Sequence, residues 1–308
     1  MSYISIRVST LRGDQKIGFD TYVKINDKHI LYLRQGDSFE GGRLKKLKEK
    51  KVRQMFILKD EEQKYLGYLK MNIESAYDPA TTKDVGNRAE IIQGSQQGNI
   101  ENVFENPQDA DNYNKTKEEA GKYVEFILNT TNAATALLNI ENTDQNVAHH
   151  GVSVSTLSVA LAKRLGQIDE KKIQLMALGA LLHDYGHNLH PLDLGMPVAA
   201  MSPDNYKIWK NHPRLGAENV RNTKHFDPAV LNIILQHEEK CNGSGPLGMN
   251  EKDQDPLATL VSSANTVDRL LSFEKISKAD LPKKLTIDYM GCHPLMHIQQ
   301  LNEIIKAL

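Results

Sequence analysis

The chain has 308 residues, enough for two domains at ~100–200 residues per domain, and 40% of its residues are hydrophobic, which suffices for a packed core. Its 38 Lys and Arg residues balance 39 Asp and Glu residues, so a net charge of −1 provides no overall basic field for binding a nucleic-acid backbone. Two cysteines indicate a reducing compartment, and without a signal peptide or a run of ~18 apolar residues we expect a cytoplasmic protein that does not span a membrane.

Residues 1–75 are predicted to form a small α/β accessory or regulatory domain. Alternating apolar residues predict a hairpin whose strands meet at Asn26-Asp27-Lys28, followed by a short helix and two more strands. The expected strands are 21–25, 29–33, 54–58 and 65–69, and the expected helix is 43–51. A regulatory or docking role and a purely structural role are both open for this domain.

Residues 76–114 are rich in Asn, Gln, Asp and Gly, and we expect a polar linker with at most one short helix. Residues 115–308 are predicted to form an all-α domain, which gives an α+β protein overall, because helical periodicity recurs and no βαβ alternation is visible. Its first helix, 115–138, either forms a homodimer or packs on its own bundle. The other expected helices are 148–165, 169–184, 204–222, 228–240, 256–272 and 294–307.

His183-Asp184 directly follows the apolar run from Leu175 to Leu182 and therefore ends a buried helix. Desolvating an imidazole and a carboxylate is unfavourable unless they are paired or coordinated, and a divalent metal would satisfy both. For the dipeptide alone, the alternative is an Asp-His hydrogen bond at a helix end that Gly186 terminates.

Further candidate ligands on other predicted helices favour a metal site. They are His150, His212, His237, Glu238, Asn265 and Asp268. Scattered ligands of this kind converge in the core of a helix bundle. Without thiolates, histidines and carboxylates favour iron, manganese or zinc over magnesium, and so many ligands favour two ions over one. A structural zinc or calcium site is not supported, because no CxxC, HExxH or EF-hand pattern is present.

Read in order, three motifs resemble the HD-GYP branch of the HD phosphohydrolases over about residues 150 to 270. They are His183-Asp184-Tyr185-Gly186-His187 (HDIGK in the family), His237-Glu238-Glu239 with Asn242-Gly243-Ser244-Gly245 (HHE and DGSGYP), and Ala264-Asn265-Thr266-Val267-Asp268 (ADxxD). The resemblance implies an HD-type helix bundle that hydrolyses cyclic di-GMP at a binuclear centre, with iron favoured and manganese or zinc as alternatives. Asp184 would then bridge the ions, and the candidates above would complete their coordination.

Four signature positions depart from the family pattern. Glu238 stands for the second histidine of HHE, His187 for the lysine of HDxGK, Pro246-Leu247 for Tyr-Pro, and Asn265 for a metal-binding aspartate. Asn265 is neutral, so Asp268, one helical turn later, is a competing ligand.

The family lysine is thought to neutralise the substrate phosphate. The resemblance assigns this catalytic and substrate-binding role to His187, which would have to be protonated. His190 is an alternative phosphate contact, and Lys275 lies near the place of the family's arginine-proline-tyrosine stretch.

Two functions therefore remain open. One is an active cyclic-dinucleotide phosphodiesterase, and the other is a weakly active or inactive HD-GYP protein that senses cyclic di-GMP or binds signalling proteins.

Overall fold

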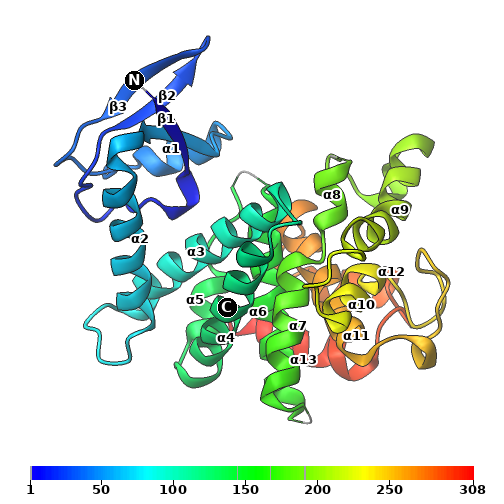
Figure 1. Ribbon diagram of the computed structural model, residues 1–308. Helices are drawn as coiled ribbons and strands as arrows, with labels where there is room; N and C mark the ends of the chain where they lie inside the picture. Colours follow the sequence, from blue (N-terminus) through cyan, green and yellow to red (C-terminus); the bar gives the residue numbers. More distant parts are fainter. Residues whose placement is uncertain (1, 144, 167, 191) are drawn as a thin grey trace. The chain divides into compact units, whose positions relative to one another are not determined.

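The computed structural model describes residues 2–143, 145–166, 168–190 and 192–308 (Figure 1). The chain divides into two units, one up to Gly98 and one from Asn99 to Leu308. The division falls within helix α3 (Val85–Glu105). Within the described residues, no helix combines the length and the apolar character needed to cross a bilayer.

The first unit contains an antiparallel four-stranded sheet in the order β1-β4-β2-β3. Its elements are β1 (Tyr3–Arg7), β2 (Thr21–Ile25), β3 (Lys28–Leu33), α1 (Arg43–Glu49), β4 (Gln54–Leu58) and α2 (Glu62–Tyr77), with 3-10 turns at Val8–Thr10 and Lys59–Glu61. The predicted hairpin forms because Asn26 and Asp27 both adopt positive φ, as a two-residue turn between twisted strands requires. Strand β1 was not among the sequence predictions.

The predicted strand at 65–69 is wrong, because these residues belong to helix α2. Tyr65, Tyr68, Asn72 and Ala76 are its buried positions, and their spacing of three to four residues is that of one helix face. Both tyrosine rings meet Phe19 edge-on, with ring centroids 5.6 Å apart, within the core of this unit.

The polar composition of residues 76–114 was also misleading about local structure. Helix α3 occupies 21 of these residues, and helix α4 (Ala110–Asn129) begins before the segment ends. Gln93, Gln96 and Gln97 are almost fully buried, and the Gln93 amide donates to Gln97 Oε1 at 3.2 Å. Amide side chains can be buried when they are hydrogen-bonded, so polarity alone did not indicate exposure. The domain boundaries themselves stay a prediction.

The regular elements of the second unit are helices within the described residues, apart from an isolated bridge between Asn242 and Asn250, which confirms the predicted α+β class with an HD-type helix bundle. Its helices after α4 are α5 (Ala133–Leu138), α6 (Val147–Leu165), α7 (Glu170–Leu182), α8 (Tyr185–Leu189), α9 (Pro203–Val220), α10 (Pro228–Gln236), α11 (Pro256–Asp268), α12 (Leu281–Asp288) and α13 (Leu295–Lys306). A π-helical turn, Arg269–Phe273, extends α11, and 3-10 turns occur at Val198–Ala200 and Glu251–Asp253. Helices α8 and α12 were not predicted.

Helix α6 lies in the middle of this unit, beside α7 (Figure 1). Every residue from Ala148 to Ala162 is buried, because α4, α5, α7, α11 and α13 all pack around α6. Gly151 permits its close approach to α7, since a Cβ there would lie 2.6 Å from the carbonyl oxygen of Leu181. The approach brings His150 of α6 and His183 at the end of α7 to neighbouring positions.

The predicted helix 115–138 is broken into α4 and α5 at Asn132, which has a φ of 61°. The apolar face of α4, including Ala120, Val124 and Ile127, is buried and packs against α6 and α7. Dimerisation through this segment stays a prediction, but the apolar stripe that suggested it is already covered within the unit.

Candidate metal centre

Five histidines surround the buried carboxylate of Asp184, which has an exposed fraction of 5%. On one side, Asp184 Oδ2 lies 3.5 Å from His183 Nε2 and 3.6 Å from His150 Nε2. On the other, Oδ1 lies 3.3 Å from the Nε2 atoms of both His212 and His237, and 3.9 Å from that of His187. Each carboxylate oxygen therefore faces its own set of imidazoles.

The ends of helices bring most of these side chains together. His183 caps the C-terminus of α7, Asp184 begins α8, and His237 caps the C-terminus of α10. His212 reaches the site from the middle of α9, next to the internal Pro213. Gly186 makes this possible, because any side chain there would overlap the backbone carbonyl of His212.

Three of the histidines are held by the same backbone contact. The Nδ1 atoms of His183, His212 and His237 lie 2.7, 2.6 and 2.9 Å from the carbonyl oxygens of Ala180, Trp209 and Ile234, each three residues earlier. Because a carbonyl oxygen can only accept, Nδ1 carries the proton and Nε2 presents its lone pair toward Asp184. Second-shell bonds of this kind orient metal-ligating histidines.

His150 is held differently, by two residues of the third motif on α11. Its Nδ1 donates to Asp268 Oδ2 at 2.6 Å, and its Nε2 lies 2.9 Å from Asn265 Oδ1. Asn265 Nδ2 in turn donates to Glu238 Oε1 at 3.1 Å. Asn265 therefore lies on the same side of the imidazole ring as Asp184, and Asp268 lies on the opposite side.

The arrangement fits divalent metal ions. Buried side chains form three groups, and within each group the potential ligand atoms lie within 4.8 Å of one another. The groups are His150 with His183 and Asp184, Asp184 with His187 and His212, and His212 with His237 and Glu238. His183 Nε2 is buried without a hydrogen-bond partner within the described residues. An imidazole lone pair left unpaired next to a carboxylate is a costly arrangement unless a cation completes it.

The protonation states agree with this fit. Burial lowers the pKa of His183 to about 3, so its ring is neutral. Burial alone would raise the pKa of Asp184, but the surrounding histidines, His183 foremost, hold it well below its usual value. A neutral imidazole, as at His183, and an ionised carboxylate, as at Asp184, are the forms in which these groups ligate metals. Burial acts to lower the pKa of His150, but its hydrogen bond to Asp268 raises that pKa above the ordinary value.

His187, predicted to contact phosphate as a cation, is buried beside the cluster. Its ring stacks on that of His212 with centroids 3.9 Å apart. Burial, followed by the proximity of His212, lowers its pKa well below the ordinary value of 6.5. A neutral His187 cannot replace the positive charge of the family lysine, so its surroundings do not support the proposed cationic role.

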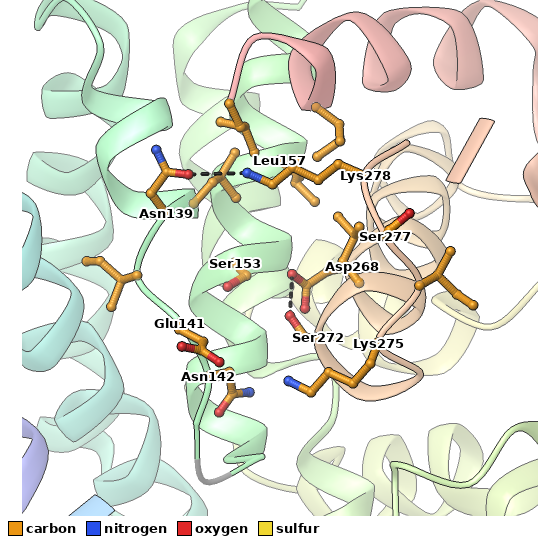
Figure 2. Close-up of a pocket in the computed structure, with 16 residues that line it drawn as sticks. Asn139, Glu141, Asn142, Ser153, Leu157, Asp268, Ser272, Lys275, Ser277 and Lys278 are labelled. Carbon is orange, nitrogen blue, oxygen red and sulfur yellow. Dashed lines mark hydrogen bonds between the residues drawn. The ribbon is translucent and has the colours of Figure 1, made fainter. Parts of the chain in front are cut away.

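The other two predicted substrate contacts lie outside the cluster. His190 is exposed at the C-terminal end of α8. Lys275 is exposed and lines a pocket of about 340 Å³ that Asp268 also lines. Figure 2 shows Lys275 directed toward Asn142 in this pocket, while the Asp268 carboxylate accepts a hydrogen bond from the Ser272 hydroxyl at 3.0 Å.

Sequence reasoning missed two side chains that support the site. Lys240 donates to the Thr266 hydroxyl at 3.0 Å and lies 3.9 Å from Glu238 Oε2. Glu239 accepts from the backbone N–H groups of Leu247 and Met249, at 2.7 and 2.8 Å. Glu239 thus fixes the loop that replaces the family's Tyr-Pro. Its position directly after Glu238 was the available signal.

The third residue missed is Arg269, which directly follows Asp268. Its exposed fraction is only 8%, although no sequence pattern marked it as buried. A π-helical turn begins at Arg269, and such turns are frequent at functional sites.

Comparison with known proteins supports this description. A family model described as HD domain matches residues 147–270. Two curated relatives are the cyclic di-GMP phosphodiesterase PA4108 of Pseudomonas aeruginosa, 24% identical over 147 residues, and the cyclic di-GMP phosphodiesterase response regulator RpfG of Xanthomonas campestris, 28% identical over 128 residues. These matches cover 47% and 41% of this chain but only 35% and 34% of the relatives, so the chain spans about a third of their length.

A solved structure matches along nearly the whole chain. It is Bd1817, described as an HDG"Y"P protein from Bdellovibrio bacteriovorus, which is 62% identical with a TM-score of 0.96. The match covers 99% of this chain and 100% of Bd1817, and it includes the small N-terminal unit. The chain therefore belongs to the HD-GYP family of HD-domain proteins.

Proposed function

We propose that this protein is a metal-dependent phosphodiesterase that hydrolyses cyclic di-GMP or a related cyclic dinucleotide. The observation that carries the proposal is the two-sided environment of Asp184, in which each carboxylate oxygen faces separate imidazole Nε2 atoms at 3.3–3.6 Å. A carboxylate in this position is suited to bridging two ions. The names of the curated relatives support the choice of substrate.

The residues divide into two candidate ligand sets that share Asp184. One contains His150, His183 and Asn265 and the other His212, His237 and Glu238, with iron favoured and manganese or zinc as alternatives. When bound, such ions would lower the pKa of a water molecule and would stabilise negative charge on the phosphate oxygens.

The protein's own groups orient this centre and exclude water from it. The backbone carbonyls behind His183, His212 and His237 fix each ring with Nε2 toward Asp184. The Asp268 carboxylate plays the same part for His150 from the side away from Asp184. We therefore propose Asn265 as the ligand of the third motif and Asp268 as a positioning residue.

The second candidate function is a weakly active or inactive protein that binds cyclic di-GMP or a signalling partner. It is favoured by the neutral His187 at the lysine position and by the loop Gly245 to Met249, which lacks the family tyrosine. The metal centre would then be kept for ligand binding and stability.

Metal analysis combined with a cyclic di-GMP turnover assay tests the proposal. The unmodified protein should carry close to two transition-metal ions and release a linear product. Asp184→Asn should lose most of the metal and all turnover, while the control Asp288→Asn, on the exposed face of α12, should retain both. Two bound metals without turnover would favour the binding function, and a metal ratio well below one would contradict both functions.

A further inference from the structure

Arg269 is a buried cation whose contacts within the described residues are weak. Its nearest carboxylate oxygen, Glu274 Oε1, lies 3.7 Å from Nε, which is beyond hydrogen-bond distance. Its terminal nitrogen donates to the carbonyl of Met196 at 3.5 Å, the outer limit for such a bond. Nε itself has no hydrogen-bond partner among the residues that the structure describes. Burying a guanidinium with so few partners costs stability, so we expect that a bound ligand provides a further partner.

Arg269 is adjacent to two residues that hold histidines of the metal centre. Asp268, the preceding residue, holds His150. The guanidinium carbon lies 6.0 Å from the ring centroid of Trp209, whose carbonyl holds His212.

Two further buried nitrogen atoms in this region have no hydrogen-bond partner within the described part of the chain. They are Trp209 Nε1 and His187 Nδ1. An indole nitrogen can only donate, and it needs an acceptor when it is buried. The same region therefore combines a permanent positive charge with unpaired nitrogens. Among the described residues, the nearest carboxylate to Arg269 is that of Glu274 at 3.7 Å, which is too far for a hydrogen bond.

We propose that Arg269, assisted by the indole N–H of Trp209, binds a non-bridging phosphate oxygen of the substrate beside the metal centre. This inference rests on the proposed phosphodiesterase function and assigns the phosphate contact to a residue outside the position of the family lysine. A planar guanidinium matches the oxygens of a phosphodiester and stays charged at every physiological pH.

Binding of inorganic phosphate to the metal-loaded protein tests this assignment by calorimetry. Arg269→Ala should weaken phosphate binding about 10- to 100-fold, the usual loss when a hydrogen bond to a charged group is removed. Its metal content should stay unchanged. Trp209→Phe, which keeps an aromatic ring but removes the N–H, should weaken binding about threefold to tenfold. The matched control is Arg214→Ala, because Arg214 is exposed on α9 and pairs with Glu218 at 3.0 Å.

Arg269 is buried, so Arg269→Lys provides a variant that keeps the charge and most of the volume. It should fold as judged by circular dichroism and bind phosphate more weakly than the unmodified protein, because the forked contact is lost. The assignment is overturned if both Arg269→Lys and Trp209→Phe bind phosphate as the unmodified protein does.

Turnover separates this inference from the proposed function. If the unmodified protein cleaves cyclic di-GMP and Arg269→Ala cleaves it with unchanged kcat/KM, the phosphate contact is refuted while the phosphodiesterase stands. If no cyclic di-GMP is cleaved but phosphate binding still depends on Arg269, the anion site stands and the phosphodiesterase does not.

Discussion

Replacing Asn265 with aspartate should change metal affinity and metal-free stability in opposite directions. Asn265 Oδ1 lies 2.9 Å from His150 Nε2, and its Nδ2 donates to Glu238 Oε1 at 3.1 Å. In Asn265→Asp the amide that joins these groups becomes a second carboxylate beside Glu238. Both positions are buried, with exposed fractions of 2% and 6%, so water screens the new repulsion poorly.

The loss of stability is limited by proton uptake, because a protonated carboxyl group no longer repels its neighbour. Two facing carboxylates at an effective dielectric of 20 repel by about 5 kcal/mol at this separation. One of them can instead take up a proton, which at pH 7 costs about 4 kcal/mol for a group whose ordinary pKa is near 4. Without metal, Asn265→Asp should therefore lose up to about 4 kcal/mol of unfolding free energy. With metal, the added negative charge should tighten binding about tenfold or more, because ligand charge sets affinity for a dication.

Urea unfolding in the presence of a chelator measures the metal-free stability. Urea unfolding with Mn²⁺ and a metal-competition assay with Mn²⁺ measure the metal affinity. Asn114→Asp, on the exposed surface of α4, controls for the added charge. Asp268→Asn should behave differently, weakening metal binding about 10- to 100-fold through the loss of the charged partner of His150. The reasoning is refuted if Asn265→Asp binds metal no more tightly than the unmodified protein, or if its metal-free stability is unchanged.

Three further predictions concern the support of the site. Gly186→Ala should destabilise the protein by about 3 kcal/mol or more in thermal unfolding, because a Cβ would overlap the His212 carbonyl. The control Gly18→Ala, with open space around it, should not destabilise the protein, and equal effects of the two substitutions would contradict this explanation. Glu239→Gln should leave metal content intact but raise the KM for cyclic di-GMP by loosening the loop whose backbone it binds, and an unchanged KM would exclude that role. Burial lowers the pKa of His297 to about 4, whereas in the unfolded chain it is about 6.5, so between these pH values only the unfolded chain is protonated there. The unfolding free energy should therefore fall as the pH drops from about 6.5 to about 4. His297→Gln should flatten that decline, and an unaltered slope would disprove the assignment.

Local sequence patterns were sufficient to predict secondary structure where near neighbours in the chain set each residue's environment. The helices of the second unit show their 3.6-residue periodicity, and the hairpin shows turn residues that tolerate positive φ. They failed where a short pattern fits two structures, as at residues 65–69, and where polar side chains are buried, as in α3. In both cases contacts with distant parts of the chain decided the outcome.

The motifs that carry His150, His183, Asp184, His212 and His237 were enough to predict that these side chains converge, because they lie on separate predicted helices and follow one another in the order of the family motifs. Only the tertiary structure placed Asp268 on the far side of His150 and Asn265 beside Asp184. It also made His187 neutral and brought Arg269 close to Trp209. The physical reason is that sequence determines which groups a helix carries, whereas direction, burial and pKa depend on which other helices pack against them.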